Sequence, residues 1–151
     1  MVLFMPSVQQ PAVAGTFYSA DPEKLSHSLS AYLNSPFAWD IEAKALAVPH
    51  AGHVYSGPIA GTAYASVRHL SDRIKRVVLV GPAHRARFKG IALPSADSFA
   101  TPLGNIPVDW KVLSKAISLP QVTSTSLRPP ATTVSKEPVS NTHLRAHETL
   151  L

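Results

Sequence analysis

The chain has 151 residues, of which 45% are hydrophobic and 15% charged, so it is long enough for one globular domain and is not disordered as a whole. The formal charge is +5, but the basic residues are scattered without interleaved aromatic side chains, so we expect no nucleic-acid partner. The absence of cysteine excludes disulfides and thiolate ligands. No apolar run approaches the roughly 18 residues of a membrane span, so we expect no membrane contact. The N-terminus lacks the basic start of a signal peptide, and together with the absence of cysteine this fits a cytoplasmic protein.

Residues 10–18 predict a coil or short edge strand with a glycine turn. A helix follows, because Asp21 can cap its first turn and Pro22 suits its first position. Its apolar side chains share one face at helical spacing and are Leu25, Leu29, Tyr32 and Leu33. The segment Asn34-Ser35-Pro36 predicts its end.

The centre of the chain predicts a strand, a helix and a second strand. Residues 44–49 and 76–80 are apolar on both faces, as strands of a covered parallel sheet are. Between them, Ser56 or Gly57 can cap a helix with Pro58 at its first position, and the small residues of this helix would allow close packing on the sheet. We therefore predict an α/β fold with a mostly parallel open sheet and flanking helices.

The rest of the chain predicts smaller elements and then a tail. A short strand at 91–93 and a turn at 101–104 precede a helix capped by Asp109. From Val122 serine, threonine and proline dominate, and residues 139–149 resemble one reading frame of a transposase sequencing adapter. We therefore expect the N-terminal part of a domain over residues 1–121 and a disordered or non-native tail, frame-shifted or derived from the adapter, over residues 122–151.

Two histidines, His50 and His84, follow the predicted parallel strands. Both would lie at the carboxyl end of the sheet, where open α/β sheets hold their ligands. Two imidazoles there can bind one transition metal or act as acid and base. The plainer interpretation is that each imidazole bonds a backbone carbonyl in its turn. His53 could add a third polar group, although a solvent-facing side chain is the simpler expectation.

Other polar residues near these loops have weaker functional interpretations. Tyr55, Ser56 and Gly57 stand at the predicted helix start, which could bind an anion, although Ser56 is more simply a cap. Asp97 is the one nearby carboxylate that could join the site, with a surface turn as the alternative. Two further histidines, His27 and His69, are expected on the surface without partners.

Six short segments resemble the Memo family in the same order along the chain. They are residues 12–18 (AVAGTFY), 48–52 (VPHAG), 55–57 (YSG), 80–84 (VGPAH), 92–97 (ALPSAD) and 101–104 (TPLG). The resemblance covers about residues 8–120. The family includes the AmmeMemoRadiSam system protein B and is similar in fold to class III extradiol dioxygenases, which hold non-haem iron with two histidines and a carboxylate.

This resemblance implies that His50 and His84 correspond to the family's two metal-site histidines. It implies an iron or copper cofactor, a redox or dioxygenase-like role on an unknown small molecule, and partners from the AmmeMemoRadiSam system. The alternative is a non-catalytic module that binds a ligand or protein in the same pocket.

The chain departs from the family pattern at three places. His53 stands where tyrosine is usual, and Ala83 stands where serine is usual. The Glu-His-Ser-Leu-Glu-Val-like segment that should follow residue 120 is missing, together with the later ligands. We therefore expect the chain as it stands to be inactive.

Overall fold

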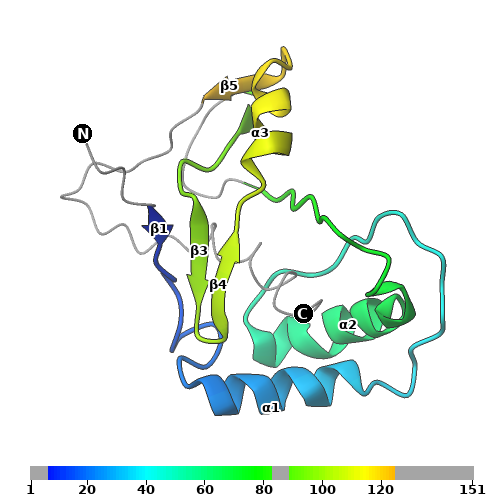
Figure 1. The fold of residues 1–151 in the computed structure, drawn as a ribbon. Helices are drawn as coiled ribbons and strands as arrows, with labels where there is room; N and C mark the ends of the chain where they lie inside the picture. Colours follow the sequence, from blue (N-terminus) through cyan, green and yellow to red (C-terminus); the bar gives the residue numbers. More distant parts are fainter. Residues whose placement is uncertain (1–6, 83–88, 125–151) are drawn as a thin grey trace.

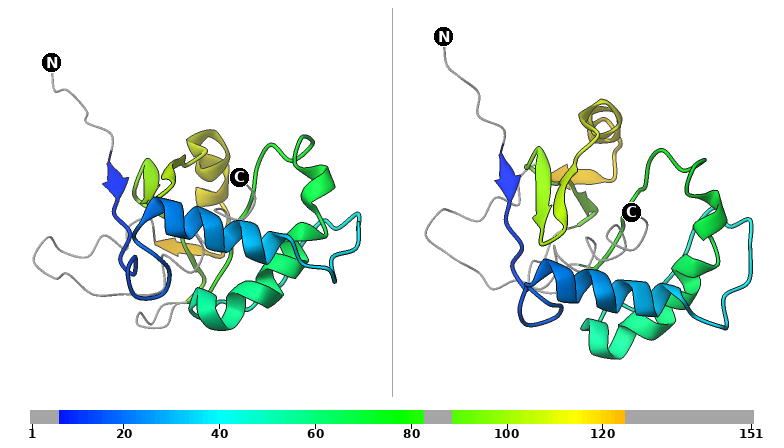
Figure 2. Two further views of the ribbon diagram at one scale, coloured as in Figure 1. Left: turned by 90° about the horizontal axis from the view of Figure 1, so that it is seen from below. Right: turned by 60° about the horizontal axis from the view of Figure 1, so that its bottom comes forward.

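The structure is a computed structural model that describes residues 7–82 and 89–124. Its helices are α1 (Pro22–Leu33), α2 (His53–Ala65), the short 3-10 helix η1 (Arg68–Leu70) and α3 (Trp110–Ile117). Its strands are β1 (Val8–Gln9), β2 (Ile91–Ala92), β3 (Ser98–Thr101), β4 (Gly104–Pro107) and β5 (Val122–Ser124). Figure 1 shows α1 and α2 together along one side of the molecule and the strands with α3 on the other, and the two views of Figure 2 agree.

The strands form a mixed sheet and a separate pair. In the larger sheet, β3 lies between β1 and β4, parallel to β1 and antiparallel to β4. The second pair is β2 with β5, and it is parallel. Helices together with a mixed 3-stranded sheet confirm the α/β class.

α1 forms where the sequence predicts it. The Asp21 carboxylate accepts a hydrogen bond from the Lys24 N–H at 3.0 Å, which supplies one of the partners that a first helical turn lacks. At the other end, the Asn34 N–H bonds the Ser30 carbonyl at 3.1 Å and closes the last turn. A local side chain therefore sets the start of this helix, and a local backbone hydrogen bond closes its end.

The buried face of α1 is the centre of the main hydrophobic core. Leu25 is 0% exposed and Leu29 is 6% exposed, as expected for their helical spacing. Both pack with Val13 and Tyr18, which precede the helix in the chain. This packing fixes the N-terminal segment against α1.

α2 packs on α1 and not on a sheet, and two glycines bring the helices close. A Cβ added to Gly57 would lie 2.6 Å from the ring of Tyr32 on α1. A Cβ added to Gly61 would lie 2.6 Å from both the Cβ and the carbonyl oxygen of the same tyrosine. The small residues of α2 do permit close packing, but the prediction that a sheet is the partner is wrong.

The predicted parallel strands at 44–49 and 76–80 are not strands in the structure. Both segments are outside every helix and strand, and no hydrogen bond pairs their backbones with another described residue. A parallel sheet is stable when helices cover both of its faces, because its strands are apolar on both sides. Here α2 packs against α1 and does not cover these segments. This is the physical reason why the predicted strands do not form.

Three of the remaining features agree with the sequence, namely β2, the turn at residues 101–104 and α3, whereas β3 was not predicted. The turn at residues 101–104 connects β3 to β4, and the Asp109 carboxylate caps α3 by accepting from the Val112 N–H at 3.1 Å. Residues 122–124, placed by the sequence in the tail, form β5 against β2. The rest of the predicted tail lies outside the described residues. No helix in the described ranges is long and apolar enough to cross a membrane.

Candidate functional site

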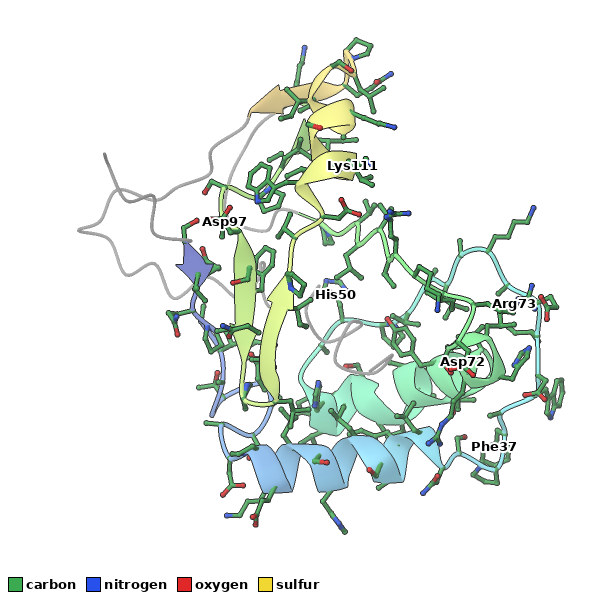
Figure 3. The ribbon with its side chains drawn as sticks, viewed as in Figure 1. Phe37, His50, Asp72, Arg73, Asp97 and Lys111 are labelled. Atoms are coloured by element: carbon green, nitrogen blue, oxygen red, sulfur yellow. The ribbon has the colours of Figure 1, made fainter. Side chains whose placement is uncertain are left out.

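His50 lies at the exposed end of the segment that leads into α2. Figure 3 shows it well separated from Phe37 and Arg73, which lie toward the far end of α2. The other predicted metal-site histidine, His84, lies outside the described residues. The structure therefore places one of the two histidines, and the surroundings of His50 can be built up from its neighbours in the chain.

The start of α2 holds the backbone that follows His50. The hydroxyl of Ser56 donates to the Ala51 carbonyl at 2.7 Å, and the N–H groups of Tyr55 and Ser56 bond the Gly52 carbonyl at 2.8 and 3.0 Å. These bonds close the loop onto the first helical turn. Ser56 thus orients the residues next to His50, which is a different task from the helix cap that the sequence predicts.

Residues 12–18 support the same loop from the other side. The Phe17 carbonyl accepts a hydrogen bond from the His53 N–H at 2.9 Å. Residues 12–18 are themselves folded back, because the Gly15 N–H bonds the Tyr18 carbonyl at 2.7 Å and Gly15 has a φ of 83°. Two segments that the sequence singles out separately are thus one structural unit. No side-chain pattern signals such a backbone contact, so sequence reasoning missed it.

His53 is buried, so the expectation of a solvent-facing side chain is wrong. Its residue is 8% exposed, and its ring centroid lies 5.5 Å from that of Tyr18 and 6.2 Å from that of Tyr32. The second ring is perpendicular to the imidazole, a common aromatic arrangement. His53 therefore packs between the N-terminal segment and α1.

The predicted helix start at residues 55–57 is also wrong. α2 begins at His53, with Gly52 at its N-cap position, so Ser56 and Gly57 lie inside the helix and Pro58 is in its second turn. The buried Gly57 faces Tyr32, whereas Tyr55 is 82% exposed. Residues 55–57 therefore do not present free N–H groups to an anion.

Asp97 binds another part of the chain. Its carboxylate accepts hydrogen bonds from the N–H of Ser7 at 2.7 Å and from the Ser7 hydroxyl at 3.1 Å. Figure 3 shows Asp97 at the end of β3 nearest β1. These hydrogen bonds, the backbone one first, hold the pKa of Asp97 below its usual value. Asp97 thus joins β1 to β3, and the structure does not bring it to His50 as a ligand.

This lowered pKa gives a testable pH dependence. A carboxyl whose folded-state pKa is lowered stabilises the fold above its unfolded pKa of about 3.9 and loses that contribution as the pH falls through the folded value. We expect Asp97→Asn to be less stable than the parent at pH 7, with a difference that shrinks as the pH approaches 3. Urea midpoints at both pH values would measure it.

Asp72→Asn is the matched control, because its carboxylate has no hydrogen bond or ion pair with a described residue. An Asp97→Asn difference that stays the same from pH 7 to pH 3 would contradict the assigned role.

His69 has partners that the sequence does not reveal. Its Nδ1 lies 3.3 Å from the Asp40 carboxylate and its Nε2 lies 3.5 Å from that of Glu42, which also pairs with Arg73 at 3.2 Å. The expectation of an unpartnered surface histidine is wrong here. These contacts connect the loop after α1 to the end of η1. His27 is exposed on α1, as expected.

A complete metal site requires several ligand side chains close together. Among the described residues, no group of three His, Asp or Glu side chains could hold a metal ion. On α2, burial raises the pKa of the Tyr64 phenol to about 12, so this phenol stays protonated at neutral pH. The described part of the chain thus contains His50 but no such group of ligands around it.

Comparison with known proteins finds consistent relatives. Residues 9–131 match the family described as Memo-like protein. A MEMO1 family protein of Aquifex aeolicus is 36% identical over 113 residues, which are 75% of this chain and 41% of the relative. The MEMO1 family protein MHO1 of Saccharomyces cerevisiae is 40% identical over 106 residues, covering 68% of this chain and 31% of the relative. The Protein memo-1 homolog of Caenorhabditis elegans is 35% identical over 99 residues, covering 66% of this chain and 28% of the relative.

These relatives are longer than the region they share with this chain. The chain spans 41%, 31% and 28% of the three lengths. More than half of each relative therefore has no counterpart in the aligned region.

Proposed function

The chain belongs to the Memo-like protein family, and from this membership we propose that it carries part of a metal-binding site of redox or dioxygenase-like character. In this proposal His50 and His84 are two of the ligands, the metal is iron or copper, and the substrate is a small molecule. The remaining ligands belong to the part of the domain that the aligned region does not include. The metal, when bound, would supply open coordination positions and one-electron chemistry.

One observation carries the proposal. Two segments of the family match meet at the His50 loop, where the Phe17 carbonyl bonds the His53 N–H at 2.9 Å and Ser56 bonds the Ala51 carbonyl at 2.7 Å. A ligand gains affinity when its own backbone is already fixed, because less ordering is required on binding. The contacts around His50 supply such a fixed backbone, and His50 itself is exposed.

The proposal includes the larger architecture expected from the resemblance. In a complete domain, residues 44–49 and 76–81 would be parallel neighbours in an open sheet like that of class III extradiol dioxygenases, with helices on both faces. Its location is the cytoplasm, and its protein partners are those of the AmmeMemoRadiSam system. Residues 1–121 would be the N-terminal part of that domain, and the residues beyond β5 would be a non-native or disordered tail.

A metal titration tests the histidine pair. Fe²⁺ and Cu²⁺ would be titrated separately into this chain, His50→Ala and His84→Ala under equal conditions. We expect weak binding by the parent chain, because two imidazoles are an incomplete ligand set. Each substitution should weaken it about tenfold or more, since even groups that only support a ligand change metal affinity by that much.

His27→Ala is the matched control, because His27 is an exposed histidine on α1. The titration separates the two functional hypotheses. If His50→Ala and His84→Ala bind iron and copper as the parent does, the metal-site proposal fails. The alternative would then be a binding module that uses the same surface without metal chemistry.

A further inference from the structure

The segment that follows α1, residues 34–42, is held against the end of α2 by hydrogen bonds. We call this segment the α1 loop. The Trp39 N–H bonds the Ser66 hydroxyl at 3.2 Å, and the Ile41 N–H bonds the Ser66 carbonyl at 2.9 Å. None of these groups titrates near neutral pH, so this attachment of the loop does not depend on pH.

His69, on η1, makes a second attachment of a different kind. Its Nδ1 lies 3.3 Å from the Asp40 carboxylate, and its Nε2 lies 3.5 Å from the Glu42 carboxylate. A neutral imidazole carries one N–H and can donate to only one of these carboxylates, whereas an imidazolium can donate from both nitrogens. Because a carboxylate only accepts, an arrangement with a carboxylate facing each ring nitrogen suits the protonated form of His69.

The charges around His69 also favour its protonation. Glu42 pairs with Arg73 at 3.2 Å, whereas Asp40 has no other ion pair with a described residue. The two carboxylates and the one guanidinium thus leave one negative charge in excess beside the imidazole. α2 adds no Asp, Glu, Lys or Arg to this cluster. The other charged residues of η1 and the segment after it, up to position 75, are Arg68, Asp72 and Lys75.

We propose that His69 is a proton-dependent clasp on the α1 loop. With a proton on both ring nitrogens, the imidazolium bridges the Asp40 and Glu42 carboxylates and holds the loop against η1. When one proton leaves to solvent, one of the two bridges is lost. An imidazole ordinarily changes charge between about pH 5 and 8, where carboxylates stay ionised. The loop is therefore held more firmly at the acidic end of this range and less firmly at the alkaline end.

The clasp acts on a loop that carries two exposed aromatic side chains. Phe37 and Trp39 are 76% and 79% exposed, and Figure 3 shows Phe37 on the same side of the molecule as Arg73. Aromatic side chains on a backbone that is already ordered lose less entropy when they make a contact. The charge on one histidine thus sets how firmly the backbone of this aromatic pair is held, and the clasp does not require a metal.

Hydrogen exchange of the Ile41 amide tests the clasp. Because this amide bonds the Ser66 carbonyl, its protection reports how often the α1 loop opens. Exchange in this chain would be measured by NMR at about pH 5.5 and about pH 8 and corrected for the intrinsic pH dependence of amide exchange. We expect about twofold to fivefold more protection at the lower pH, the range for exposed ion pairs. The Leu29 amide, in α1, is the internal reference for changes in global stability.

Three single substitutions show whether His69 is the group that titrates. His69→Gln keeps a polar side chain that does not change charge, so the difference in Ile41 protection between the two pH values should disappear. Asp40→Asn removes one of the two bridges and should make the difference smaller. His27→Gln is the matched control, because His27 is an exposed histidine on α1, and it should keep the difference of the parent. All three residues are exposed, so each variant should remain folded.

Several outcomes would overturn the proposal. They are a parent chain in which Ile41 has equal protection at both pH values, a change at Ile41 that the Leu29 amide follows in parallel, and a His69→Gln variant that keeps the difference of the parent. Loss of the difference in His27→Gln would assign the titration to another histidine and would overturn it as well. An unchanged difference in Asp40→Asn would contradict the bridge between two carboxylates. Failure of the metal titration would leave these results unaffected.

Discussion

Leu25→Ala is expected to cost about 2–5 kcal/mol of unfolding free energy, the range for emptying a fully buried leucine site. Leu25 is 0% exposed and is the centre of the cluster formed with Val13, Tyr18 and Leu29. Because small domains are stable by only about 5–15 kcal/mol, this one change should remove a large part of the stability. Urea denaturation followed by far-UV circular dichroism would measure it.

The loss at Leu25 should also reach the candidate site. The same cluster holds residues 12–18, whose Phe17 carbonyl bonds the His53 N–H. We therefore expect faster hydrogen exchange at the His53 amide in Leu25→Ala. Leu119→Ala is the control, because Leu119 is 49% exposed and its truncation should stay within about 0.5 kcal/mol. Equal losses for the two variants would contradict the described core.

Gly61→Ala is expected to destabilise the fold by about 2 kcal/mol or more. Alanine favours a helix over glycine by up to about 1 kcal/mol, so an unconstrained site would be stabilised. At Gly61 the added Cβ would lie 2.6 Å from the carbonyl oxygen of Tyr32, and backbone cannot rotate away as a side chain can. Overpacking costs of about 1–3 kcal/mol, occasionally more, then outweigh the helical gain.

Two other glycines provide graded comparisons for Gly61. Gly57→Ala meets the Tyr32 ring at 2.6 Å, and a ring can shift, so a smaller loss is expected. In Gly52→Ala the nearest neighbour of the added Cβ would be the Phe17 carbonyl oxygen, at an ordinary 3.5 Å, so the change should cost under about 1 kcal/mol. Denaturation midpoints in the order Gly52→Ala, Gly57→Ala, Gly61→Ala would support the helix contact. A Gly61→Ala protein as stable as the parent would refute it.

The elements that sequence predicts well here are those determined by their own residues. α1 and α3 begin after Asp21 and Asp109, because each carboxylate accepts a hydrogen bond from the N–H three residues later. The turn between β3 and β4 contains Gly104, whose φ of 127° favours glycine. Short-range chemistry of this kind can be read without knowing the rest of the fold.

The elements that sequence reasoning missed depend on distant contacts. Pro58 suggests a helix start, yet α2 begins at His53, where the Phe17 carbonyl bonds the helix N-terminus. The apolar segments at 44–49 and 76–80 have strand composition but no ladder, because pairing requires a partner and not only propensity. The position of His50 before a helix was predictable, whereas its supporting contacts were not.

The backbone bond between Phe17 and His53 bears on which sequence changes the His50 loop can accept. The bond joins a carbonyl to an N–H, so it is indifferent to the identities of the two side chains. Either a histidine or a tyrosine at position 53 would therefore leave this contact intact. Changes in chain length are different, because a residue inserted or deleted within 12–18 would move the carbonyl out of register with its donor. Proline at position 53 would remove the donor itself. The loop should thus accept side-chain substitutions readily, whereas the number of residues in the segment 12–18 should stay constant.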